Sequence, residues 1–160
     1  MKKLLLVVGC VALGYVAYIR ISGLTEAGIQ DFVNASLKSN LDRDAKNYCA
    51  IYAEHAQITV VTISQTEHEQ KIYTKDEYCQ ELKKGYVTYN ATNASVNTFL
   101  TVQSLEIAPD RKSADLAGEY SEEVTIHGQT MRGVSQQTVR IELIGLKPKI
   151  TRVMAEWRGR

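Results

Sequence analysis

The sequence predicts an α+β domain in which helices pack against a curved antiparallel sheet. Between residues 25 and 85, apolar residues recur mainly at the spacing of amphipathic helices. From about residue 87 onward, the pattern changes to long alternating strands separated by short turns. Helices that precede a series of sequential strands give an α+β order, not an alternating α/β order.

The first half of this domain is expected to contain two helices and a strand. Thr25 can cap a helix over residues 25–38, and a second helix with acidic residues in its first turn is expected over 41–53. A run of β-branched residues over 58–63 then predicts a strand. The polar segment 65–70 predicts an exposed loop.

A third helix and four long strands are expected in the rest of the domain. Thr74 and Glu77 have the spacing of a capping box, so this helix begins at Thr74, and it is expected to end near Gly85. Turn residues then divide the remaining sequence into four strands, expected at residues 95–107, 113–126, 130–144 and 149–157. Hairpin links between sequential strands predict a meandering antiparallel sheet.

The N-terminal segment predicts an export signal. Lys2 and Lys3 precede an almost uncharged apolar run, Leu4 to Ile19, which Arg20 closes. This run is short for a bilayer core of about 30 Å, but snorkelling of the flanking cations can cover the difference. The positive start favours a cytoplasmic N-terminus. We therefore expect a signal anchor or signal peptide over 1–22 and an extracytoplasmic domain over 23–160, tethered in a bacterial inner membrane with the domain in the periplasm.

Two alternatives remain for this leader. The small residues of Ala12-Leu13-Gly14 offer a site for signal peptidase, which would release a secreted domain. The segment Val7-Val8-Gly9-Cys10 resembles a bacterial lipobox, which would make the chain a lipoprotein.

The cysteines are consistent with an oxidising compartment. Cys49 and Cys79 both lie in the exported domain, where two such cysteines usually form a disulfide. The bridge would close a loop of about 30 residues and stabilise the domain by roughly 2–4 kcal/mol. The alternative is a pair of buried free thiols.

Composition and motifs argue against several functions. The net charge is +1, so no strong field favours nucleic acid. His55, His68 and His127 are dispersed along the chain, so no metal site is expected. The sequence also contains no nucleotide-binding loop or nucleophile elbow, and no cofactor is expected.

The order of elements resembles the nuclear transport factor 2-like superfamily, a cone-shaped α+β fold. The segments that carry the resemblance are 42–58, which looks like a second helix running into a first strand, 73–78, and the terminal meander ending at 150–153. A cystatin-like helix packed on a sheet is the alternative. In ketosteroid isomerases of this superfamily a first-strand aspartate is the general base, and the resemblance places Val60 at that position. Valine cannot abstract a proton.

The resemblance implies a pocket at the open end of the cone. We expect a membrane-tethered binding or assembly domain that contacts a protein of the cell envelope, with a homo-oligomer as one arrangement, instead of an enzyme. The candidate contact residues for a ligand or partner are Tyr52, Tyr86, Tyr120, Trp157 and His55, because aromatic anchors dominate many interfaces. The alternatives are a lipid or small-molecule pocket, and an isomerase or cyclase that pairs Glu119 or Glu122 with Tyr52 or His55.

Overall fold

The computed structural model of the chain describes residues 23–63 and 68–158. They form helices α2 (Glu26–Leu41), α3 (Ala45–Ala50) and α4 (Lys75–Ala91), and strands β1 (Tyr52–Ile63), β2 (His68–Thr74), β3 (Ser95–Ile107), β4 (Ser113–Ile126), β5 (Gln129–Ile144) and β6 (Lys147–Arg158). The anchor, cleavage and lipobox predictions concern residues 1–22, which lie outside the described residues. Within the two described ranges, no helix has the length and hydropathy of a membrane-spanning segment.

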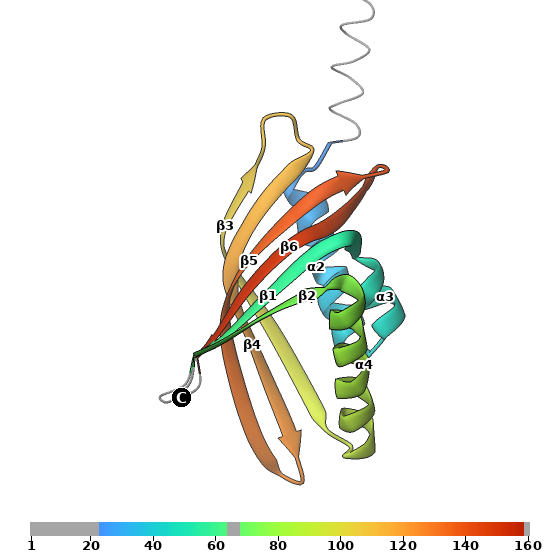
Figure 1. Ribbon diagram of the computed structural model, residues 1–160, viewed down its shortest axis with the longest axis vertical. Helices are drawn as coiled ribbons and strands as arrows, with labels where there is room; N and C mark the ends of the chain where they lie inside the picture. Colours follow the sequence, from blue (N-terminus) through green and yellow to red (C-terminus); the bar gives the residue numbers. More distant parts are fainter. Residues whose placement is uncertain (1–22, 64–67, 159–160) are drawn as a thin grey trace, which may run out of the picture.

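The six strands form one curved sheet in the order β2-β1-β6-β5-β4-β3. Figure 1 shows the helices gathered on one side of this sheet, which bends around them. Every pair of neighbours is antiparallel except β1 and β6, which run parallel. The predicted α+β class is therefore confirmed, but the sheet is mixed and not purely antiparallel. The parallel pair arises because the last strand of the meander returns to lie beside the first strand of the domain.

Several element boundaries differ from the sequence predictions, three of them by enough to matter for the site. Helix α3 ends at Ala50, because Tyr52 already pairs with Ile150 of β6. The predicted loop over 65–70 is partly strand, since β2 pairs antiparallel with β1. All residues of β2 are exposed except Tyr73, which is partly buried. Edge pairing uses backbone hydrogen bonds, so a polar sequence can form it. Helix α4 continues past Gly85, whose backbone is helical, to Ala91.

The predicted hairpin turns are confirmed. A two-residue loop, His127-Gly128, joins β4 to β5, and a second such loop, Gly145-Leu146, joins β5 to β6. All four residues have positive φ angles, between 50° and 79°. Two successive positive φ angles define the tight turn whose twist matches that of the flanking strands.

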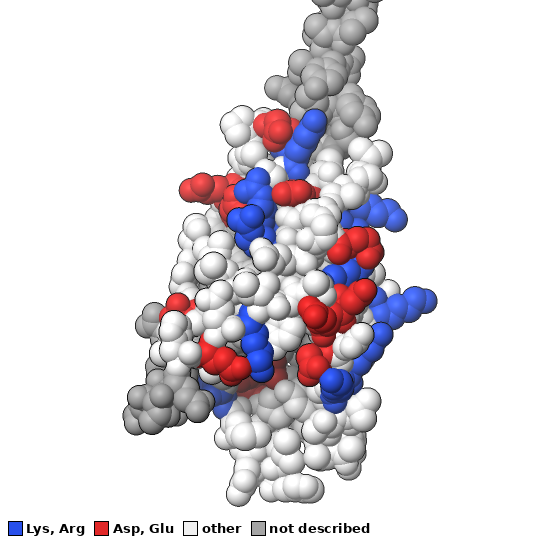
Figure 2. Space-filling model, viewed as in Figure 1, with Lys and Arg blue, Asp and Glu red and all other residues white. Residues whose placement is uncertain are grey.

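The hydrophobic core lies between α2 and the concave face of the sheet. Ile29 of α2 is 1% exposed and belongs to one buried cluster with Ile58 of β1, Leu116 of β4 and Ile141 of β5. The outer surface carries interspersed positive and negative side chains, as the face in Figure 2 shows. This distribution matches the small net charge of the chain.

The capping box of α4 gives a first prediction on stability. The backbone N–H of Thr74 donates to the Glu77 carboxylate over 2.8 Å, and the Thr74 hydroxyl accepts from the Glu77 backbone N–H. We expect Thr74→Ala to lower the free energy of unfolding by about 1 kcal/mol, measured by urea denaturation. Thr74→Ser keeps the acceptor and is the control. Equal loss in both variants would show that the threonine methyl group, not the cap, stabilises this end.

Candidate ligand-binding cavity

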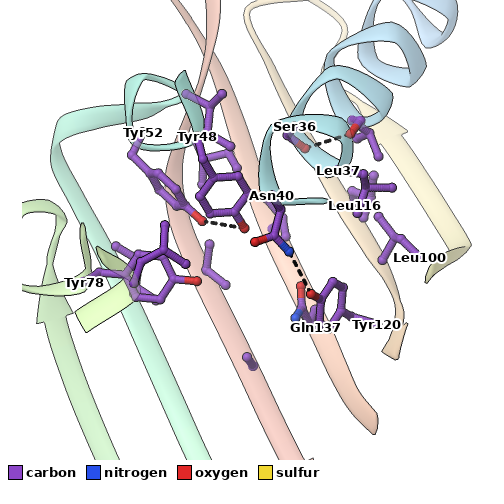
Figure 3. A pocket seen from close by; sticks show the side chains of 18 of the residues that line it. Ser36, Leu37, Asn40, Tyr48, Tyr52, Tyr78, Leu100, Leu116, Tyr120 and Gln137 are labelled. Carbon is purple, nitrogen blue, oxygen red and sulfur yellow. Dashed lines mark hydrogen bonds between the residues drawn. The ribbon is translucent and has the colours of Figure 1, made fainter. Parts of the chain in front are cut away.

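A cavity of about 190 Å³ lies between the helices and the concave face of the sheet. Figure 3 shows side chains from both layers pointing into this space. Most of its lining is apolar or aromatic, with a few polar groups at one side. The labelled lining residues of Figure 3 are Ser36, Leu37, Asn40, Tyr48, Tyr52, Tyr78, Leu100, Leu116, Tyr120 and Gln137.

Local periodicity explains how each element presents its lining residues. On α2 the lining residues are spaced three or four apart, from Phe32 through Ser36 to Asn40, so they share one face of the helix. On the strands they alternate, as Tyr120 and Glu122 do on β4, because alternate residues face the same side. Because of this periodicity, side chains from separate elements point into the same cavity.

Gly133 of β5 makes room for the indole ring of Trp157 at the cavity wall. A Cβ atom at this position would lie 2.6 Å from Cζ3 of Trp157. The ring of Trp157 also packs edge-on against Tyr120, with 6.0 Å between ring centroids. A glycine on β5 is therefore needed for the position of this aromatic wall.

Three tyrosines from three elements form the opposite wall. The ring centroid of Tyr52 lies 5.9 Å from that of Tyr48 and 5.5 Å from that of Tyr78, and both pairs are edge-to-face. The Tyr52 hydroxyl is 3.5 Å from the Tyr48 hydroxyl. Burial raises the pKa of Tyr52 well above its ordinary value. The cluster therefore presents neutral rings with polar tips to the cavity.

A polar network closes one side of the cavity. Asn40 accepts a hydrogen bond from the Tyr86 hydroxyl and donates to the Tyr120 oxygen over 3.1 Å. Tyr120 in turn donates to one oxygen of Glu122, and Tyr89 donates to the other, each over 3.0 Å. The network joins α2, α4 and β4. Burial, together with the charge of Glu122, raises the pKa of Tyr89 to about 12, so this donor keeps its proton at neutral pH.

The predicted disulfide is present and fixes part of the cavity wall. Cys49 of α3 and Cys79 of α4 are bonded, with 6.0 Å between their Cα atoms. Each cysteine directly follows a tyrosine of the wall, Tyr48 or Tyr78. Helix α3 has six residues and fully buries none of them, and the disulfide links it covalently to α4.

The structure brings together most of the site residues predicted from sequence. Tyr52, Tyr120 and Trp157 line the cavity, and the buried Tyr86 belongs to the polar network. His55, also a candidate contact residue, does not line the cavity; it lies on β1 and lines a separate shallow depression with Arg152.

The two candidate carboxylates also lie in different places. Glu122 lines the cavity, whereas Glu119 is paired with Gln136 over 3.1 Å and does not line it. Strand alternation separates them, since positions 119 and 122 differ by an odd number of residues.

Several lining residues were not singled out in the sequence. Asn40, Tyr48, Tyr78 and Gln137 all line the cavity. Helical spacing from Phe32 could have found Asn40, and the two tyrosines precede the paired cysteines. Strand alternation from Val139 and Ile141 could have placed Gln137 on the same face of β5.

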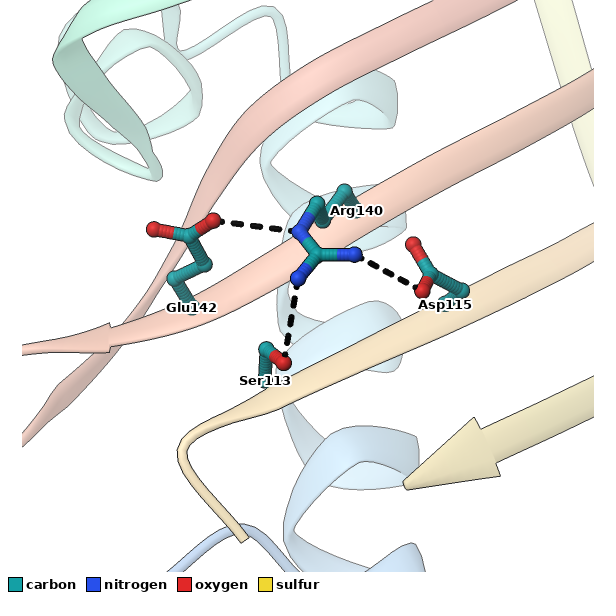
Figure 4. A network of polar contacts seen from close by, with 4 residues as sticks. All are labelled: Ser113, Asp115, Arg140 and Glu142. Atoms are coloured by element: carbon teal, nitrogen blue, oxygen red, sulfur yellow. Dashed lines mark hydrogen bonds and ion pairs between the residues drawn. The ribbon is translucent and has the colours of Figure 1, made fainter. Parts of the chain in front are cut away.

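A separate ion-pair network occupies the depression beside His55. Figure 4 shows the Arg140 guanidinium between Asp115 and Glu142, with Ser113 as a third acceptor. Its nitrogens lie 2.9 Å from the Asp115 carboxylate, 3.1 Å from Glu142 and 3.3 Å from the Ser113 hydroxyl. All three sides of the guanidinium are therefore engaged. This network is partly exposed and fixes the register of β4 and β5 only modestly.

Comparison with known proteins places the fold. No family model matches the sequence, and no curated protein matches it. Solved structures do match. A nuclear transport factor 2-like protein of unknown function from Shewanella oneidensis is 18% identical, with a TM-score of 0.56, over 81% of this chain and 97% of that one. A ketosteroid isomerase-like protein from Erwinia carotovora atroseptica is 14% identical, with a TM-score of 0.55, over 84% and 98%.

A third structure connects the two folds expected from sequence. It is described as a nuclear transport factor 2-like protein with a cystatin-like fold, from Novosphingobium aromaticivorans. It is 10% identical, with a TM-score of 0.63, over 92% of this chain and 86% of that one. The chain therefore has a nuclear transport factor 2-like α+β fold. At these identities the likeness defines the fold alone.

Proposed function

We propose that this protein is an extracytoplasmic binding domain whose cavity holds a small, largely apolar molecule. The observation that carries the proposal is the aromatic cavity of about 190 Å³. A cavity for one water needs only about 10–15 Å³, and typical ligand sites span roughly 300–1,000 Å³. A molecule built on one or two rings suits this size. The polar network at one side would orient it.

The burial of the aromatic residues favours a ligand over a protein partner. Tyr52 is 4% exposed and Tyr86 is 7% exposed, so neither side chain is accessible to a docking protein.

A protein partner is the second proposal, and it rests on other residues. Ile72 and Met154 are more than half exposed, and both flank Thr59 in the sheet register. Native mass spectrometry of the protein extracted from its membrane separates the two, by the size of the adduct.

An extracytoplasmic address is part of the proposal. The disulfide between Cys49 and Cys79 supports it, because such bonds persist in oxidising compartments. The charged and apolar pattern of residues 1–22 supports tethering to an inner membrane. Carbonate washing of host membranes tests the tether: the full-length chain should stay with the membrane, and release of the protein would argue for a cleaved leader.

Isomerase-type catalysis is the less favoured alternative. The ketosteroid isomerase-like neighbour raises it, but Val60 lines the cavity on β1, where the resemblance places a general base. Glu122, the one carboxylate among the described lining residues, accepts hydrogen bonds from Tyr89 and Tyr120. Both of its oxygens are held by tyrosine hydroxyls, an arrangement that suits ligand recognition better than proton transfer.

Filling the cavity is expected to abolish binding. Val60→Phe adds a ring to the cavity lining, whereas Val61→Phe adds the same ring on the opposite face of β1. We expect indole, a neutral probe, to bind the wild type in isothermal titration calorimetry. Val60→Phe should weaken this binding at least about tenfold, roughly 1.4 kcal/mol. Val61→Phe should leave it within about twofold. Equal binding by both variants, or no binding of indole to the wild type, would contradict the proposal.

A further inference from the structure

The described cavity lining carries negative charge and no positive charge. Among the described residues that line it, Glu122 is the single charged side chain, and no lysine, arginine or histidine accompanies it. A ligand with a carboxylate or phosphate would therefore meet a like charge and no compensating cation. The lining is unsuited to fatty acids and other organic anions.

Glu122 also lacks a counter-ion in the part of the chain that the structure describes. It forms no ion pair there, and its two oxygens accept hydrogen bonds from Tyr89 and Tyr120 only. The guanidinium of Arg43, which lies near Tyr89, instead donates to Asn90 and to the carbonyl of Ala94. A carboxylate has about four acceptor positions, so roughly two remain for a donor in the cavity.

The charge of Glu122 affects the pKa values of the neighbouring tyrosines. Burial raises the pKa of Tyr120, and the negative charge of Glu122 raises it further. The same two causes, in the same order, raise the pKa of Tyr89 to about 12. A negative potential that disfavours the deprotonated, anionic form of a tyrosine would stabilise a cation at the same place.

The rings of the wall add a second attraction for positive charge. The lining contains Phe32, Tyr48, Tyr52, Tyr78, Tyr120 and Trp157, each contributed by a different element. An ammonium group over the face of such rings is attracted electrostatically by their π electrons, more strongly when water is excluded. Aromatic walls with a carboxylate are a suitable chemical environment for organic ammonium ions.

We propose that the cavity selects small organic monocations, an aromatic or aliphatic body with one ammonium group, and that Glu122 is the residue that determines this specificity. The inference rests on the proposed function, since it names the class of ligand for the same cavity. The ammonium group would donate to the free acceptor positions of Glu122, and the apolar body would pack against the tyrosine wall.

Three ligands of matched shape test the inference by calorimetry at pH 7 and low salt. They are 2-phenylethylamine, 2-phenylethanol and 3-phenylpropanoate, which share a phenyl ring and a two-carbon chain. We expect the amine to bind at least about tenfold more tightly than the alcohol. The propanoate should show no binding at concentrations at which the alcohol saturates the cavity. Glu122→Gln keeps the shape but removes the charge, and should reduce the preference for the amine to less than about twofold. Glu119→Gln, outside the cavity, should leave all three affinities unchanged.

Each other outcome is decisive. Equal affinities of amine and alcohol in the wild type, or propanoate binding as tight as the amine, would overturn the cation preference while leaving a ligand cavity in place. An amine preference that survives Glu122→Gln would overturn the role of Glu122. If indole binds but none of the three ligands does, the inference fails alone; if indole also fails to bind, the proposed function fails with it.

Discussion

Replacing Cys49 and Cys79 together by serine is expected to lower the free energy of unfolding by about 2–4 kcal/mol. The bond closes a loop across a sequence separation of 30 residues, and opening it returns that freedom to the unfolded chain. It also releases α3, which has no buried residue of its own. Because Tyr48 and Tyr78 directly precede the two cysteines, we expect indole affinity to fall as well.

Urea denaturation of the wild type and the double serine variant measures this loss. Adding a reductant to the wild type should reproduce the variant, and adding it to the variant should change nothing, which separates the bond from any effect of serine itself. Non-reducing and reducing gels of the wild type should differ in mobility. Identical midpoints for the wild type and the variant would show that α3 is held by its packing alone.

Turns, caps and long strands could be predicted from the sequence because their causes are local. His127-Gly128 has the two positive φ angles of a tight hairpin, and Thr74 with Glu77 satisfies the backbone at the start of α4. The turns and the cap do not depend on a distant part of the chain. The disulfide was expected because the leader predicts export of the domain that contains both cysteines.

The rest of the fold depends on contacts that the local pattern does not contain. Residues 68–74 are polar and almost entirely exposed, yet they form β2 because an edge of β1 is there to pair with. Tyr52 was expected at a helix end but begins β1, because β6 returns beside it in parallel. The start of β1 is set by pairing with β6, whose partner residues are about 95 positions away, and β2 is set by pairing with β1. Alternation within a single segment cannot reveal either pairing.

The same reason limits prediction of the site. Tyr52, Tyr120 and Trp157 were identified as aromatic candidates and line the cavity. Strand alternation separates Glu119 from Glu122, but it does not say which face of β4 points toward the helices. His55 occupies another depression. Which side chains share a cavity is a property of sheet curvature and helix placement, and both are decided by the whole domain.

Replacing Tyr52 by alanine is expected to cost about 3–5 kcal/mol, the usual loss for truncating a large buried ring. The side chain is 4% exposed and stands between Tyr48 and Tyr78, with edge-to-face contacts to both. Its removal leaves those rings without their shared neighbour and widens the cavity. Indole should then bind more weakly, because a larger space packs less closely around the same ligand.

Tyr52→Phe is the matched control, because it keeps the ring and removes only the hydroxyl. That hydroxyl has a long contact of 3.5 Å with Tyr48, so its loss should cost no more than about 0.5–1.5 kcal/mol. Urea denaturation gives both stabilities, and calorimetry with indole gives both affinities. If phenylalanine is as damaging as alanine, the hydroxyl contacts, not the packing of the rings, hold the wall together. If both variants are as stable as the wild type, the tyrosine cluster is not part of the core, and the cavity built on it must be discarded.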